Sequence, residues 1–173
     1  MRTVANAYRL RRLRPGKIEA SALITSREAA KRFRGAVKPP EVQETRNVDG
    51  SLHSLCLLIA ASSGEEIQVQ VDQAGAETPA SWNPRTRWDV DLRAIAEYGG
   101  RMDPVRNLGV EAYWTGRAIL NVLTRVATLR FVFPDGNHRG LDERLARNAL
   151  ARLGDRAPTN LVTTEQAQAT ARQ

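Results

Sequence analysis

The amino-acid sequence predicts a mostly α protein, a compact helical domain with at most one short β-hairpin. Residues 110–129 are apolar on nearly every helical face, which is typical of a helix at the centre of a domain. Residues 141–153 place leucine and alanine at helical spacing, and residues 48–59 carry an apolar stripe of the same period. We therefore expect a helical bundle packed around the 110–129 helix.

The N-terminal half begins with a strong local signal. Thr25-Ser26-Arg27-Glu28 has the form of a capping box and predicts a short helix that closes near Gly35. Pro39-Pro40 then breaks the chain before the second predicted helix, which spans residues 48–59. Its apolar stripe includes the single cysteine, Cys56, which we expect to be a buried core residue and not a nucleophile.

The centre of the chain contains the one segment that alternates like a strand. Ile67, Val69 and Val71 are separated by polar residues, so residues 67–72 predict a single short strand. Asn83 as N-cap and Pro84 at the first helical position predict the next helix, which Gly99-Gly100 ends.

The loop 131–140 joins the predicted central helix to the helix after it and concentrates polar groups. Backbone N–H groups of Gly136 and Asn137 at a helix start favour an anion. Arg139 can clamp phosphate oxygens, and Asp135 can hold a Mg²⁺ ion that bridges them. The alternative interpretation is a plain surface turn, because Pro-Asp-Gly-Asn is composed of turn-forming residues.

This loop resembles the active-site motif of the Fic (filamentation-induced-by-cAMP) family, His-x-Phe-x-(Asp/Glu)-Gly-Asn-x-Arg-x-x-Arg. The matching residues are Phe133, Asp135, Gly136, Asn137 and Arg139. Residues 144–158 resemble the helix that follows the motif, and residues 18–29 and 41–52 resemble two earlier regions. The resemblance implies a Fic-like helical bundle that transfers AMP from ATP to a protein hydroxyl, with ATP and Mg²⁺ as cofactors.

The sequence also departs from the family's motif at two positions. Phe131 replaces the histidine that acts as general base, and a phenyl ring cannot accept a proton, so we expect the transfer to be lost or altered. Asp142 replaces the second arginine, and a carboxylate there would repel a triphosphate. Arg144, two residues later, is the other candidate for contact with the phosphates, and it is a poor substitute because it points to a different helix face. His138 is the candidate for a displaced base; the alternative is a solvent-exposed loop histidine.

Charge is concentrated at the N-terminus. Residues 1–38 contain 11 lysines and arginines against Glu19 and Glu28, a balance of +9, and the whole chain is +7, which leaves −2 for residues 39–173. We predict a basic arm over residues 1–17, a Fic-like domain over 18–162 and a disordered tail over 163–173.

Three functions remain open at this stage. The first is a degenerate Fic-like module that binds a nucleotide, a phosphate group or a protein partner through the 131–140 loop. The second is an active Fic-like nucleotidyltransferase that uses His138. The third is a non-enzymatic interaction or assembly protein whose residues 1–38 contact nucleic acid. The chain has no apolar run long enough to span a membrane and no apolar signal core, so we expect it to be cytoplasmic.

Overall fold

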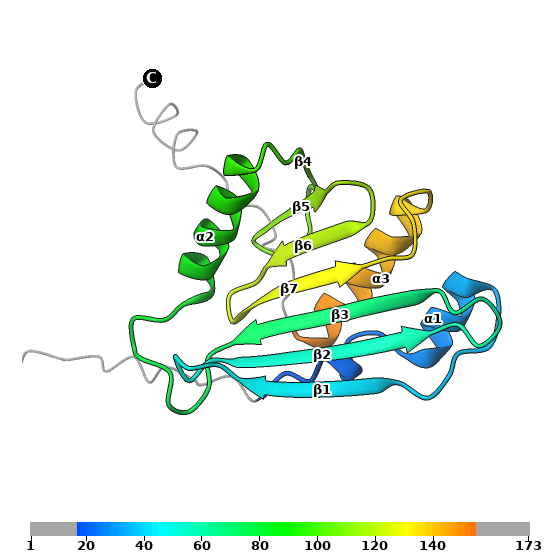
Figure 1. Cartoon of the computed structure of the whole chain (residues 1–173), viewed down its shortest axis with the longest axis horizontal. Helices are drawn as coiled ribbons and strands as arrows, with labels where there is room; N and C mark the ends of the chain where they lie inside the picture. The colour runs from blue at the N-terminus through cyan, green and yellow to red at the C-terminus, as the bar shows by residue number, and fades with distance from the viewer. Residues whose placement is uncertain (1–16, 155–173) are drawn as a thin grey trace, which may run out of the picture.

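A computed structural model describes residues 17–154 and shows a sheet-rich protein (Figure 1). Within these residues a seven-stranded antiparallel sheet has the order β1-β2-β3-β7-β6-β5-β4. The strands are β1 (Glu41–Arg46), β2 (Leu52–Ile59), β3 (Glu66–Gln73), β4 (Met102–Pro104), β5 (Glu111–Thr115), β6 (Ile119–Leu123) and β7 (Ala127–Val132). The helical elements are η1 (Ala20–Ala22), α1 (Ser26–Phe33), α2 (Pro84–Glu97) and α3 (Arg139–Arg152).

The prediction of a mostly α bundle is therefore wrong, and the predicted central helix is the main error. Residues 110–129 form β5, β6 and the start of β7. Their apolar residues are buried on both faces of the sheet: Trp114 and Leu120 belong to the main core, whereas Tyr113 and Leu123 pack beneath α2. A strand covered on both faces reads as a continuous apolar run, so its period of two is hidden. Gly116, at φ +62°, allows the tight turn between β5 and β6.

The predicted 48–59 helix is also a strand. Cys56 and Leu58 of β2 point into the core, while Leu55, Leu57 and Ile59 are half-buried on the opposite face. Because neighbouring positions of β2 are apolar, the same residues fit a helical stripe and a strand equally well. The prediction that Cys56 is a buried core residue is confirmed: it is fully buried, and burial raises the pKa of its thiol.

Predictions that rested on local hydrogen bonding or on clear periodicity are confirmed. Thr25 and Glu28 form the reciprocal capping box of α1. The Asn83 side chain accepts a hydrogen bond from the Thr86 N–H at 2.9 Å, and Pro84 opens α2. The alternating segment is strand β3, and the helix after the 131–140 loop is α3.

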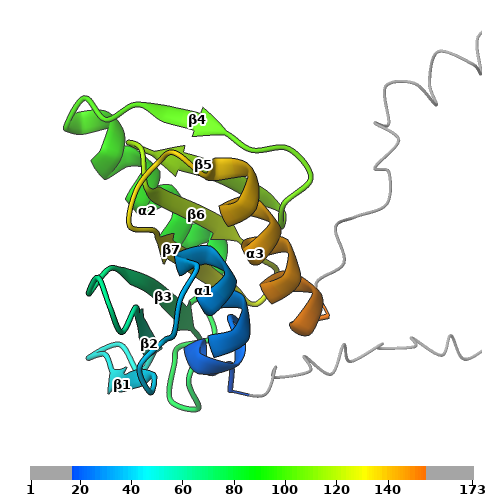
Figure 2. The same ribbon diagram turned by 90° about the vertical axis from the view of Figure 1, so that its right-hand side faces the viewer.

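The sheet separates two unequal layers of helix. Helices α1 and α3 cover one face, and the main core lies between them and the sheet (Figure 2). Helix α2 lies on the other face, where Trp88 packs with Tyr113 and Leu123 in a second, smaller cluster. Helix α2 covers only the β5, β6 and β7 part of this face and leaves β1, β2 and much of β3 open (Figure 1).

The described residues begin at Lys17, so almost all of the predicted basic arm lies outside them, as does the predicted tail over 163–173. Within residues 17–154, none of the helices combines the length and apolar character that a membrane span requires.

Candidate functional site

The residue at the predicted position of a catalytic base belongs to the hydrophobic core. Phe131 lies in β7, is fully buried and stacks on Phe133 with ring centroids 6.3 Å apart. The β7–α3 connection therefore starts from a fixed point in the core, and the polar groups of the loop follow Phe133.

The guanidinium of Arg139 is engaged by the protein itself. It donates to Asp103 Oδ2 at 3.0 Å and to the Gly116 carbonyl at 2.7 Å. It also lies 5.0 Å from the ring centroid of Trp114. These contacts join the start of α3 to β4 and to the β5–β6 turn. They support a structural role for the residue that the sequence predicts as a phosphate clamp.

The Asp-Gly-Asn part of the loop is an internally bonded turn. Asp135 Oδ1 accepts the Asn137 N–H at 2.8 Å and Arg32 Nη2 at 3.2 Å. The bond from the Asn137 N–H is the main reason that the pKa of Asp135 lies below its usual value. A Cβ on Gly136 would lie 2.5 Å from the carbonyl oxygen of Arg117, so glycine is required by close packing.

The remaining residues of the predicted site do not gather around one point. His138 is exposed at the N-cap of α3, and its side chain makes no cap hydrogen bond. Arg144 is exposed on α3. Asp142 is fully buried and accepts Arg32 Nε at 2.6 Å. No group of three or more His, Cys, Asp or Glu side chains in the part of the chain that the structure describes could hold a metal ion.

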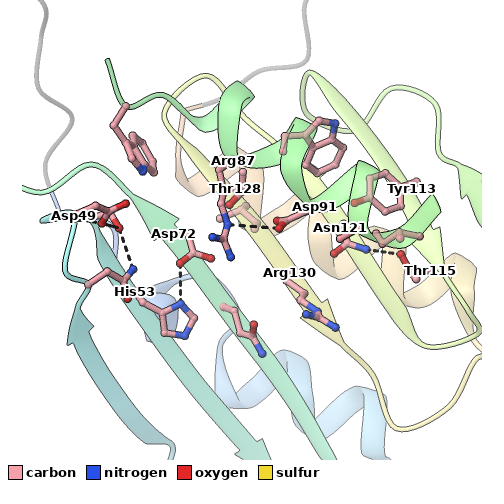
Figure 3. Close-up of a pocket in the computed structure, with 18 of the residues that line it drawn as sticks. Asp49, His53, Asp72, Arg87, Asp91, Tyr113, Thr115, Asn121, Thr128 and Arg130 are labelled. Carbon is pink, nitrogen blue, oxygen red and sulfur yellow. Dashed lines mark hydrogen bonds and ion pairs between the residues drawn. The ribbon is translucent and has the colours of Figure 1, made fainter. Parts of the chain in front are cut away.

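The opposite face of the sheet contains a cavity of about 720 Å³ beneath α2, here called the α2 cavity (Figure 3). Its walls come from α2, from the β1–β2 turn and from strands β2, β3, β5, β6 and β7. Its polar lining includes His53, Gln70, Asp72, Arg87, Asp91, Tyr113, Asn121, Thr128 and Arg130. This volume lies in the range of small-molecule sites, roughly 300–1,000 Å³.

Strand register explains why these side chains meet. Gln70 of β3 pairs with Arg130 of β7, Arg130 pairs with Asn121 of β6, and Asn121 pairs with Tyr113 of β5. Two residues along the strands, a second row contains His53, Asp72 and Thr128. Directly opposed residues of antiparallel strands project from the same face, so both rows line the cavity floor.

A histidine–carboxylate pair lies at one side of the floor. His53 Nδ1 is 2.9 Å from Asp72 Oδ1. The neutral ring that fits this contact carries its proton on Nδ1 and leaves Nε2 as an acceptor. Both side chains are partly exposed, at 30% and 26%. The pair thus stays accessible to solvent and to a ligand.

Three polar groups of the cavity lack a partner. Within residues 17–154, no hydrogen bond or ion pair engages the guanidinium of Arg130, the hydroxyl of Tyr113 or the hydroxyl of Thr128. Tyr113 and Thr128 are only 6% and 7% exposed. Burial raises the pKa of Tyr113 to about 12, so its hydroxyl keeps its proton and can donate at neutral pH.

Helix α2 faces this floor with a half-buried acid. Asp91 Oδ1 lies 3.5 Å from Arg87 Nε, an ion pair without hydrogen-bond geometry. Burial is the main cause that raises the pKa of Asp91, and the nearby charge of Asp72 raises it further. The carboxylate of Asp91 therefore keeps capacity to accept a hydrogen bond from a ligand.

The tryptophans divide between core and cavity. Trp88 is buried, donates Nε1–H to Glu111 Oε2 at 2.9 Å and lies 4.8 Å from the ring centroid of Tyr113. Trp114 is also buried. Trp82 is only half-buried, and both Trp82 and Trp88 line the cavity. Trp82 offers a ligand an aromatic surface beside the polar floor.

Comparison of the chain with family models, curated proteins and solved structures finds no match in any of the three. The fold that the motif resemblance implies is contradicted by the sheet. Neither the comparisons nor the structure support a Fic domain or AMP transfer.

Proposed function

We propose that this protein binds a small polar ligand with an acidic group in the α2 cavity. The observation that carries the proposal is the convergence of three groups without partners in the described chain: the Arg130 guanidinium and the hydroxyls of Tyr113 and Thr128. Arg130 is exposed, and the only buried side-chain polar atom without a hydrogen-bond partner in the described chain is Asp142 Oδ2, so these three groups are open to solvent in the cavity, where they can bond to a ligand.

Arg130 is the natural partner of the acidic group. A guanidinium presents two parallel N–H donors that match a carboxylate or a phosphate. The other arginine of the cavity, Arg87, already has Asp91 as a partner. The hydroxyl of Thr128, on the same strand and face as Arg130, supplies a further donor next to it.

The test is a titration of isotope-labelled protein, followed by the backbone amide resonances. The ligands are acetate, succinate, inorganic phosphate and ATP with Mg²⁺, each measured separately. We expect saturable shifts in β3, β7 and α2 with at least one of these anions. Arg130→Gln should weaken that binding about tenfold or more, because a charge-assisted hydrogen bond is lost.

Two further variants make the titration decisive. Arg27→Gln removes an equally exposed arginine from α1, on the other side of the sheet, and should leave the shifts unchanged. Arg144→Gln removes an exposed arginine of α3 that the sequence predicts to contact phosphate, and so tests the alternative site around the 131–140 loop. Saturable binding that depends on Arg144 and not on Arg130, or shifts that never reach β7, would contradict the proposal.

Contact of the basic arm with nucleic acid or with a protein partner stays a prediction, since residues 1–16 lie outside the described chain. Deletion of these residues should abolish such binding, and a nucleic-acid partner would show a steep dependence on salt.

A further inference from the structure

We infer that the ligand of the α2 cavity is a zwitterion of the amino-acid type, whose carboxylate binds Arg130 and whose protonated amine binds between Asp91 and Asp72. The inference rests on the proposed function, because it assigns the chemical class of the ligand for that same cavity.

The charges of the cavity are mixed in sign. Three carboxylates and two guanidiniums line it: Asp49, Asp72, Asp91, Arg87 and Arg130. With a neutral His53 these groups sum to −1. A nucleotide triphosphate or another compact polyanion would meet three carboxylates against two arginines, one of which already pairs with Asp91, so charge disfavours it. A ligand that carries both signs is favoured instead.

Both signs occur on the helix and on the sheet: α2 contributes Arg87 and Asp91, and the sheet contributes Arg130 and Asp72. Arg130 projects from β7 at the centre of the sheet, with Gln70 and Asn121 as its cross-strand neighbours. Asp91 projects from α2 across the cavity, and Asp72 from β3 (Figure 3). Burial is the main cause that raises the pKa of Asp91; the nearby charge of Arg87 opposes this rise, the charge of Asp72 adds to it and the charge of Arg130 opposes it. A cation between the two carboxylates offsets their repulsion.

The existing contacts leave capacity for that cation. Among the described residues, Asp91 forms only the 3.5 Å ion pair with Arg87, whose side chain is 54% exposed, and the nearby charge of Arg130 also acts on it. Asp72 uses Oδ1 for His53 and keeps Oδ2 without a described partner. An ammonium group has three donors and no acceptor, which suits two carboxylates that converge from neighbouring walls.

Neutral polar groups complete the predicted arrangement. Tyr113 and Thr128 are buried residues of the cavity lining, and their hydroxyls have no partner within the described residues but are not closed off from solvent. Asn121 donates its amide to Thr115 Oγ1 at 2.9 Å, which leaves its Oδ1 as an acceptor toward the cavity. The volume of about 720 Å³ exceeds what one small amino acid fills, so a large side chain or a dipeptide also fits.

The experiment is calorimetric titration of the full chain with the free amino acids and with a set of Ala-Xaa dipeptides. For each compound that binds, its N-acetylated and its C-amidated forms are then measured. We expect each blocking group to weaken binding at least tenfold, because each removes one of the two ionic contacts.

Variants connect each end of the ligand to its partner. In the Asp91→Asn variant, acetylation of the ligand's amine should reduce the binding affinity much less than it does in the wild type. Amidation of the ligand's carboxylate should reduce the affinity as much as it does in the wild type. In Arg130→Gln the pattern should reverse. This cycle isolates the pairwise contact from general effects on the cavity. Asp89→Asn, on the same helix but outside the cavity lining, is the control and should behave like the wild type.

The outcomes separate this inference from the proposed function. If acetate or succinate binds through Arg130 but no amino acid or dipeptide binds more tightly, the zwitterion is wrong and the anion site stands. The same holds if acetylated compounds bind as well as free ones. If no anion binds at all, both proposals fail. Melting temperatures of the variants within a few degrees of the wild type exclude misfolding as the cause.

Discussion

Arg32 Nε donates to Asp142 Oδ1 at 2.6 Å, and this buried ion pair joins α1 to α3 across 110 residues of chain. Arg32 Nη2 also reaches Asp135 at 3.2 Å, so one guanidinium ties the first helix to both the 131–140 loop and the last helix. Asp142 Oδ2 is buried without a hydrogen-bond partner within residues 17–154. Burial raises the pKa of Asp142 even though Arg32 favours its charged form.

The pair leads to a prediction about stability. Arg32→Met leaves the Asp142 carboxylate buried and uncompensated, and we expect a loss of about 3–5 kcal/mol in the free energy of unfolding. The double variant Arg32→Met/Asp142→Leu should recover most of that loss, because no charge remains to be buried. Urea denaturation measures both. A single variant that is as stable as the wild type would show that the pair does not hold the helices together.

The environment of Glu28 leads to a prediction about how the stability of the protein depends on pH. It accepts hydrogen bonds from Thr25 N–H at 2.9 Å and from Arg152 Nη2 at 2.9 Å, which joins the start of α1 to the end of α3. Burial alone would raise its pKa, but the bonds from Arg152 and Thr25 outweigh it and lower the pKa from 4.5 to about 2. A carboxyl whose pKa is lower in the folded state stabilises the fold above the unfolded value.

We therefore expect this contribution, about 3 kcal/mol at most, to be fully present above pH 4.5 and to disappear as the pH falls toward 2. Glu28→Gln should be less stable at pH 7 and should lose less stability between pH 4.5 and 2. Chemical denaturation at a series of pH values checks this. Parallel curves for wild type and variant over that interval would refute the assignment.

Two glycines of the β7–α3 region provide a matched pair. A Cβ at Gly136 would lie 2.5 Å from the Arg117 carbonyl oxygen, whereas nothing lies within 4 Å of a Cβ at Gly140. Gly136→Ala should cost about 1–3 kcal/mol through overpacking. Gly140→Ala should be neutral or stabilise the protein by up to about 1 kcal/mol, since alanine favours the first turn of α3. Thermal unfolding of the two variants distinguishes a packed loop from an open one.

The contrast between predicted and observed elements has a physical cause. Signals carried by a few adjacent residues, such as the Thr25–Glu28 capping box and Asn83-Pro84, predicted α1 and α2 correctly. The helix predicted over residues 110–129 is wrong because burial on both faces of the sheet removes the alternation of apolar and polar residues that marks a strand. The error in β2 arose in a similar way, from a run of adjacent apolar residues.

The functional site could not be predicted from sequence for a related reason. The sequence drew attention to the 131–140 loop because its polar residues are consecutive. The residues that form ion pairs with the loop, Arg32 and Asp103, come from distant segments of the chain. The α2 cavity depends on register. Arg130 meets Gln70 and Asn121 only once β3, β7 and β6 are paired. The one available signal was the polar face of β3, since Gln70 and Asp72 alternate with buried valines.

We expect the hydroxyl of Tyr113 to contribute to ligand binding and not to the stability of the fold. Tyr113 is 6% exposed, and its ring packs on Trp88 with centroids 4.8 Å apart. Tyr113→Phe keeps that ring and deletes a hydroxyl that has no hydrogen-bond partner among the described residues. We therefore expect the melting temperature to stay within a few degrees of the wild type, because the fold loses no hydrogen bond.

The same variant should weaken ligand binding three- to tenfold, the loss expected for one neutral hydrogen bond of about 0.5–1.5 kcal/mol. Thr128→Val, which deletes the other unpartnered hydroxyl, should behave alike, whereas Thr45→Val on the exposed β1 should change neither property. Calorimetry and thermal unfolding on the same samples measure both effects. A clear fall in melting temperature for Tyr113→Phe would mean that its hydroxyl serves the fold, and would remove it from the binding site.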